Sequence, residues 1–225
     1  MEMEIVLPEE VAVMTLPEVA FFPQALLPLH IFEPRYRQML KTVLASDRLF
    51  AVAGLNPAGA DEAFEPAHRV GTIGIVRACQ KNDNGTSNLL LQGLARVEFL
   101  ETVREEPYRT MRMRALASAP GADRDENVRL RTSVARLLSL KQRLGASVSS
   151  EFTQFLKTVD DPETFVDLAA FSLCENPVLK QRLLETLDVH QRLRLFNEHL
   201  RRDIDALKLR KKLQGSLGDD SIENN

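Results

Sequence analysis

The chain has 225 residues, enough for one large domain or two small ones. Hydrophobic residues make up 44% and charged residues 27% of it, as in a soluble protein with a real core. The formal net charge of −3 excludes a global attraction to nucleic acid or anionic lipid. The acidic N-terminus, MEMEIVLPEE, lacks the features of a signal peptide, and no stretch approaches the ~18 apolar residues of a spanning helix. We therefore expect a cytoplasmic protein with no membrane segment, in which Cys79 and Cys174 are free thiols.

Up to about residue 120, short apolar runs are interrupted by Pro, Gly and Asn, a pattern that predicts strands and turns. Pro23 and Pro28 keep one apolar stretch extended, whereas Pro34 is placed to begin a helix, because a proline at the first helical position loses no hydrogen bond. The hairpin signal Asn82–Gly85 and a bend at Gly93 separate neighbouring strands. The predicted strands are residues 10–16, 49–53, 70–81, 87–92 and 95–103, with a last one around 111–115. Residues 54–69 are predicted to form a loop.

Beyond residue 120 the pattern becomes helical. Residues 125–144 carry apolar side chains at helical spacing. Asp161-Pro162 and Asn176-Pro177 each place a capping side chain before a proline. Asp188 is followed three residues later by Gln191, as in a capping box. Three further helices are therefore predicted to begin at these signals.

The last helix carries one apolar stripe over about six turns. Its members are Val189, Leu193, Phe196, Leu200, Ile204 and Leu207. Two interpretations are open. Either the other C-terminal helices cover the stripe within one chain, or it stays partly open and forms a homo-dimer or receives a client. The small, polar residues from Gly215 onward predict a disordered tail.

Local signatures of catalysis are missing from the sequence. There is no phosphate-binding G-x-x-x-x-G-K-[ST] loop, no H-E-x-x-H zinc motif, no G-x-S-x-G nucleophile elbow and no G-x-G-x-x-G dinucleotide motif. His190 and His199 are nine residues apart, so they do not share a helix face as metal ligands would. We therefore expect a binding module with no catalytic residues, no metal and no cofactor, rather than an enzyme.

Three segments carry a family resemblance. The first is FPQALLPLHIFEPRY at residues 22–36. The second is VGTIG at 70–74 with LQGLAR at 91–96. The third combines LAAF at 168–171, KQRLLE at 180–185 and the pair Arg192-Leu193. In this order they resemble the N-terminal, substrate-binding domain of Lon proteases, and the form H-I-F-E-P-R-Y is typical of its bacterial stand-alone members.

The resemblance implies an α+β fold with two lobes. A β-rich, PUA-like lobe would occupy residues 1–118, a helical bundle lobe residues 119–214, and the disordered tail residues 215–225. Because the chain ends at Asn225, we expect no ATPase or protease domain. The role implied is recognition of unfolded or exposed hydrophobic protein segments, with protein or peptide clients as partners and self-association as a further possibility.

The candidate substrate-binding residues lie in the first matched segment: Phe22, Leu29, Phe32, Arg35 and Tyr36. Each also has a structural interpretation, since the core absorbs such aromatic and aliphatic side chains, and Arg35 lies where it would stabilise a helix start. For Arg96 the interpretation favoured is a pair with a carboxylate, and for the 180–185 stretch a solvated helix face or an inter-lobe contact.

An RNA-binding PUA-like module is the alternative function. Its best support is a basic cluster near the end of the last helix: Arg201, Arg202, Lys208, Arg210, Lys211 and Lys212. Asp203 and Asp205 interrupt that cluster, and basic residues are common at helix ends. With the net charge of −3, these observations make nucleic acid the less favoured partner.

Overall fold

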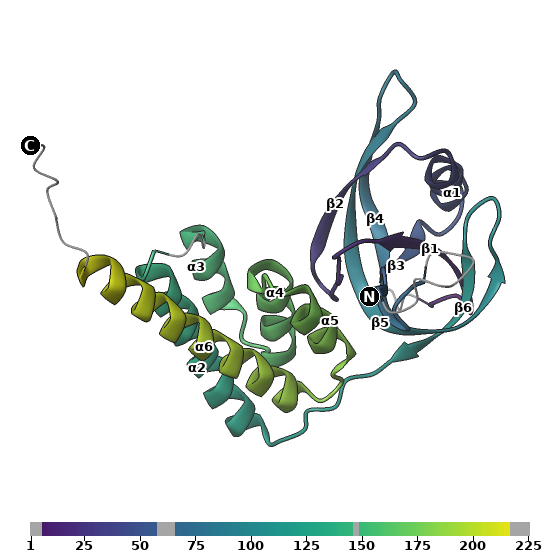
Figure 1. Ribbon diagram of the computed structural model, residues 1–225. Helices are drawn as coiled ribbons and strands as arrows, with labels where there is room; N and C mark the ends of the chain where they lie inside the picture. Colours follow the sequence, from purple (N-terminus) through teal and green to yellow (C-terminus); the bar gives the residue numbers. More distant parts are fainter. Residues whose placement is uncertain (1–5, 58–65, 146–148, 217–225) are drawn as a thin grey trace, which may run out of the picture. The chain divides into compact units, whose positions relative to one another are not determined.

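The computed structural model describes residues 6–57, 66–145 and 149–216, and its α+β architecture confirms the expected fold class (Figure 1). The strands are β1 (Glu10–Leu16), β2 (Leu26–Ile31), β3 (Leu49–Gly54), β4 (Val70–Lys81), β5 (Ser87–Arg104) and β6 (Thr110–Leu116). The helices are α1 (Pro34–Leu44), α2 (Arg124–Arg143), α3 (Ser150–Thr158), α4 (Pro162–Leu173), α5 (Pro177–Glu185) and α6 (Val189–Ser216).

The six strands form one sheet that closes on itself through the long strand β5. The order is β2-β5-β4-β3-β1-β6, and β6 pairs with β5 as well as with β1. Closure is possible because β5 has 18 residues: its first half pairs with β2 and its second half with β6, while β4 runs along most of its length. A closed sheet leaves few unpaired strand edges. Its interior is filled by a cluster of buried side chains: Val11, Val13, Leu49, Ala51, Ala53, Ile73, Val97, Phe99 and Met113.

The predicted division into two strands at Gly93 is wrong, because Gly93 lies inside the single strand β5, but the pairing with β4 is irregular there, between Gly93 and Ala95. Its missing side chain serves a close approach of the backbone. Gly93 donates to Ala25 O and accepts from the N–H of Gln24, both at 2.9 Å, and a Cβ on Gly93 would collide with Phe22 O. The hairpin prediction is confirmed, since β4 and β5 are joined by a turn in which Gly85 adopts a φ of +79°.

The predicted helix starts are confirmed by hydrogen bonds at three helices. Asp161 accepts from the backbone N–H of Thr164 at 2.7 Å, and Asn176 accepts from that of Leu179 at 2.9 Å. Asp188 accepts from the N–H of Gln191 at 2.7 Å, at the start of α6. Helix α3 was not among the predicted elements.

The stripe of α6 is covered within the chain as far as Ile204. Val189, Leu193, Phe196, Leu200 and Ile204 are all at most 5% exposed. Helix α2 packs along α6, where Lys141 lies 2.6 Å from Asp203. The stripe therefore belongs to the interior of the helical part, as in the first of the two interpretations.

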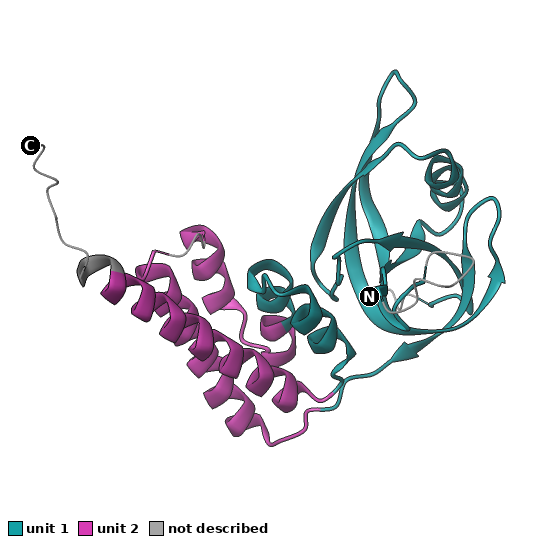
Figure 2. Cartoon of the chain, viewed as in Figure 1, with its two compact units in different colours: residues 1–119, 167–187 teal, residues 120–166, 188–225 magenta. Residues whose placement is uncertain are grey.

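The chain divides into two compact units, and the division differs from the expected one (Figure 2). The sheet unit comprises residues 1–119 together with 167–187, and the helical unit comprises 120–166 and 188–225. A single boundary after residue 118 therefore does not describe the chain, because the end of α4 and all of α5 pack with the sheet. Helix α6 also continues to Ser216, since Gly215 weakens a helix without stopping it, so the first two residues of the expected tail are helical. The rest of that tail, residues 217–225, lies outside the described residues.

Candidate functional site

The buried side chain of Arg96 links α5 to the sheet. Arg96 of β5 is 2% exposed, and its guanidinium donates to both carboxylate oxygens of Asp167 at 2.8 and 2.6 Å. Its Nε donates to Leu184 O at 3.0 Å. Such a bidentate contact fixes the relative orientation of the guanidinium and the carboxylate as well as their separation. The interpretation of Arg96 as a partner of a carboxylate is confirmed, and the contact sets the position of α5 on the sheet.

Helix α5 then presents a buried side-chain amide with an unused acceptor. The Nε2 of Gln181 donates to Val70 O at 3.1 Å and to Glu185 Oε1 at 2.8 Å. Both partners are acceptors, so they fix which end of the amide is nitrogen. Gln181 is 6% exposed, and among the residues that the structure describes its Oε1 has no hydrogen-bond partner. A buried acceptor left unpaired costs about 1–3 kcal/mol, and an N–H group from a ligand would relieve that cost.

Gln181 also lines a hollow of about 720 Å³, which we call the α5 hollow. Its walls come from α5, the segment after β1, the end of β3 and the segment before β4. The residues are Pro17, Glu18, Val19, Ala20, Gly54, Leu55, Asn56, Pro57, His68, Pro177, Val178, Gln181, Arg182 and Glu185. Gly54 leaves room in front of the amide, because a Cβ there would lie 3.4 Å from Gln181 Oε1 and 2.9 Å from Val19 O.

The chemistry of the α5 hollow suits an uncharged or basic polypeptide segment. Val178 is 78% exposed and, with the prolines, offers apolar surface. Glu185 adds a carboxylate, which lies 3.7 Å from His68 Nδ1. Apolar walls with a few placed polar groups are the usual composition of ligand sites. Within the described ranges, no three His, Cys, Asp or Glu side chains are grouped as ligands of a metal ion.

Comparison with known proteins identifies the family. The family model of the ATP-dependent protease La (LON) substrate-binding domain matches residues 10–202. The chain belongs to this family. Two curated relatives are the Lon proteases of Desulfosudis oleivorans, 25% identical over 216 residues, and of Syntrophus aciditrophicus, 28% identical over 218 residues. Each alignment covers 95% of this chain, but only 26% and 28% of the respective relatives, so the chain spans about a quarter of their length.

Solved structures of Lon N-terminal domains share the fold. The N-terminal domain of Mycobacterium avium complex Lon protease has a TM-score of 0.66 at 19% identity, over 85% of this chain and 97% of that one. The Lon N-terminal domain protein from Xanthomonas campestris has a TM-score of 0.59 at 20% identity, over 82% and 95%. In the part of the chain that the structure describes, no helix is both long and apolar enough to cross a membrane.

The first Lon-like segment places two of the five predicted site residues in the interior. Phe22 is fully buried, with the Arg96 guanidinium 5.7 Å from its ring centre. Tyr36 is 6% exposed, and its hydroxyl donates to Thr15 O at 3.4 Å. Neither side chain has enough free surface to contact a client directly. For these two aromatics the structure shows packing, the structural interpretation that the sequence left open.

The other three predicted residues are accessible, but none of them lines the α5 hollow. Arg35 lies 4.5 Å from the ring centre of Tyr36 and 2.9 Å from Glu33, and it lines a separate hollow of about 350 Å³ with Tyr36. Leu29 is half-buried on β2, opposite Leu89. Phe32 is 60% exposed. The structure thus brings Arg35 and Tyr36 together and leaves Leu29 and Phe32 outside both hollows.

The residues that form the α5 hollow were not predicted as a site. The family-like stretch KQRLLE contained Gln181 and Glu185, which were interpreted as a solvated face or an inter-lobe contact. For Gln181 the second interpretation is confirmed, because it is buried against β4 of the expected β-rich lobe, whereas Glu185 is exposed at the rim. Burial lowers the pKa of the neighbouring Lys180, whose ammonium lies 5.6 Å from the ring centre of Phe171. The available signal was the position of Gln181 three residues after Val178 and three before Leu184, on the same face of the helix as these apolar residues.

Proposed function

We propose that this chain is a non-catalytic, cytoplasmic module that binds exposed segments of other proteins through the α5 hollow. The observation that supports this is a hollow with apolar walls, lined by Gln181, whose buried Oε1 has no hydrogen-bond partner among the described residues. A polypeptide supplies both complements at once, a main-chain N–H for the acceptor and an apolar side chain for the walls. Membership of the Lon substrate-binding family supports the same class of ligand. A direct role of Leu29, Phe32 and Arg35 in binding stays a prediction.

A short, blocked, neutral peptide of Leu, Val, Ser and Gly with a fluorescent label tests this proposal. Gln181→Met keeps the side-chain volume but removes the acceptor together with the Nε2 donor to Val70 O and Glu185 Oε1, so affinity should fall about tenfold. Val178→Asp places a charge on exposed apolar surface and should also weaken binding without unfolding the chain, because Val178 is 78% exposed. Fluorescence anisotropy gives both affinities, and circular dichroism checks the fold.

Two matched variants serve as controls. Gln154→Met changes an exposed glutamine of α3, and Val128→Asp changes a valine of α2 that is 40% exposed. Both should keep the affinity of the unchanged chain. If Gln181→Met and Val178→Asp bind as tightly as these controls, the α5 hollow is not the binding site.

A further inference from the structure

A third hollow lies beside a free strand edge, at the hairpin end of the sheet. Strand β3 pairs with β4 as far as Leu49 opposite Ile75, and the last link is the N–H of Val76 to Arg48 O at 2.9 Å. From Ala78 to Lys81, β4 pairs only with β5 among the described strands. An unpaired edge presents N–H and C=O groups to which another extended chain can add.

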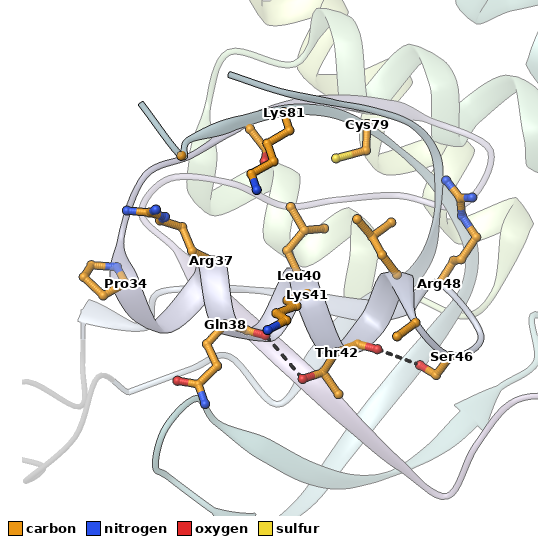
Figure 3. A pocket seen from close by; sticks show the side chains of 14 residues that line it. Pro34, Arg37, Gln38, Leu40, Lys41, Thr42, Ser46, Arg48, Cys79 and Lys81 are labelled. Carbon is orange, nitrogen blue, oxygen red and sulfur yellow. Dashed lines mark hydrogen bonds between the residues drawn. The ribbon is translucent and has the colours of Figure 1, made fainter. Parts of the chain in front are cut away.

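Helix α1 and the end of β4 enclose a groove of about 1430 Å³, which we call the α1–β4 groove. Figure 3 shows Leu40 rising from α1 toward the strand, and Cys79 and Lys81 reaching from the strand toward the helix. Leu40 is 3% exposed and forms part of the floor. The groove therefore combines an apolar floor with the strand edge.

The charged side chains that line the α1–β4 groove are all cations: Arg37, Lys41, Arg48 and Lys81. Among the described residues none of the four lies within ion-pair distance of a carboxylate. By contrast, Arg35, Arg69, Arg112 and Arg114 of the same unit are each paired with a glutamate. Like charges gathered in a groove raise the local potential and favour an anionic ligand.

We infer that the α1–β4 groove binds an extended, acidic polypeptide segment, whose backbone adds to the edge of β4 and whose carboxylates contact Arg37, Lys41 and Lys81. The lining contains no aromatic side chain on which nucleobases would stack, whereas Leu40, Leu44 and Cys79 suit aliphatic side chains. Charge complementarity and the strand edge together select a polypeptide over a nucleic acid. This site is separate from the α5 hollow and does not depend on it.

The test uses the full chain and an acidic version of the labelled peptide, with Glu in place of each Ser. It should bind more tightly than the neutral peptide, and raising the salt concentration from about 0.05 M to about 0.5 M should weaken it. The triple variant Arg37→Gln/Lys41→Gln/Lys81→Gln should lose affinity for it on the order of tenfold, yet bind the neutral peptide unchanged. A control with the same change of charge is Arg129→Gln/Arg136→Gln/Lys157→Gln, at exposed positions of the helical unit.

Two further measurements locate the ligand. Cys79 is half-buried in the groove and Cys174 is 2% exposed, so alkylation reports mainly on Cys79. The acidic peptide should slow that alkylation, and methylation of alternate peptide nitrogens should weaken binding by blocking hydrogen bonds to the strand edge. The inference would be overturned if the two triple variants bound the acidic peptide equally well, or if the peptide left the alkylation of Cys79 unchanged. It would also be overturned if the methylated peptide kept full affinity, or if a short single-stranded RNA bound equally tightly. Failure of the α5 hollow would show with the neutral peptide instead, so the two outcomes are distinguishable.

Discussion

The sheet unit and the helical unit both have long-range ion pairs, but the pair in the sheet unit is buried more deeply: the side chains of Arg96 and Asp167 are each 2% exposed, whereas those of Lys141 and Asp203 are 9% and 27% exposed. In the sheet unit, Arg96 reaches Asp167, 71 residues away, and Gln181 reaches Val70, 111 residues away. In the helical unit, the starts of α2 and α6 are fixed by side chains that cap an N–H three residues ahead. Local signals therefore place helices in the sequence, whereas a long-range polar contact decides that α5 packs with the sheet.

The largest expected effect comes from breaking the long-range contact. Arg96→Met leaves the carboxylate of Asp167, which is 2% exposed, without its cation. Removing one partner of a buried pair costs about 3–5 kcal/mol, and we expect the upper part of that range because Leu184 O also loses its donor. Chemical denaturation followed by circular dichroism measures the loss.

A double variant sharpens this result. Arg96→Met/Asp167→Leu removes both charges and should recover most of the stability, because two apolar side chains leave no buried charge unpaired. A double variant as unstable as Arg96→Met would show that packing around Arg96, and not its charge, holds α5 on the sheet.

The helical unit should be sensitive to its apolar core instead. Phe196 is fully buried, so Phe196→Ala should cost about 3–4 kcal/mol and lower the melting temperature sharply. Leu209→Ala on the same helix removes a side chain that is 58% exposed and should change stability by less than about 0.5 kcal/mol. Calorimetry gives the stability and sedimentation the association state. A folded Phe196→Ala chain of unchanged stability would contradict the assignment of Phe196 to the intrachain core.

The smallest expected loss of stability comes from removing a helix cap. Asp188→Ala removes the cap of α6 and should cost about 1 kcal/mol, the usual contribution of such a cap. Asp205→Ala changes an exposed aspartate within α6 that lies 4.0 Å from Lys208, and it should have almost no effect. Equal losses for the two variants, measured by thermal denaturation, would mean that the local cap does not stabilise this boundary.

The residues that form the candidate site were not predictable from local sequence patterns. Phe22 and Tyr36 were predicted as binding residues because aromatic side chains are common at interfaces, but the same side chains also fill cores. Gln181 was not predicted as a binding residue, since a glutamine on a helix is usually solvated. Its importance depends on Val70 and Gly54, which are far from it in the sequence and adjacent to it only after folding.

The sequence by itself determined the α+β class, most strand positions and the helix starts at Pro162, Pro177 and Val189. Alternation, turn residues and caps act over a few residues, so they can be recognised in one dimension. The tertiary structure decided that β5 is continuous through Gly93, that α5 packs with the sheet and that Gln181 Oε1 finds no partner within the described part of the chain. Each of these outcomes depends on which distant groups meet after burial, because only burial makes an unpaired charge or acceptor costly.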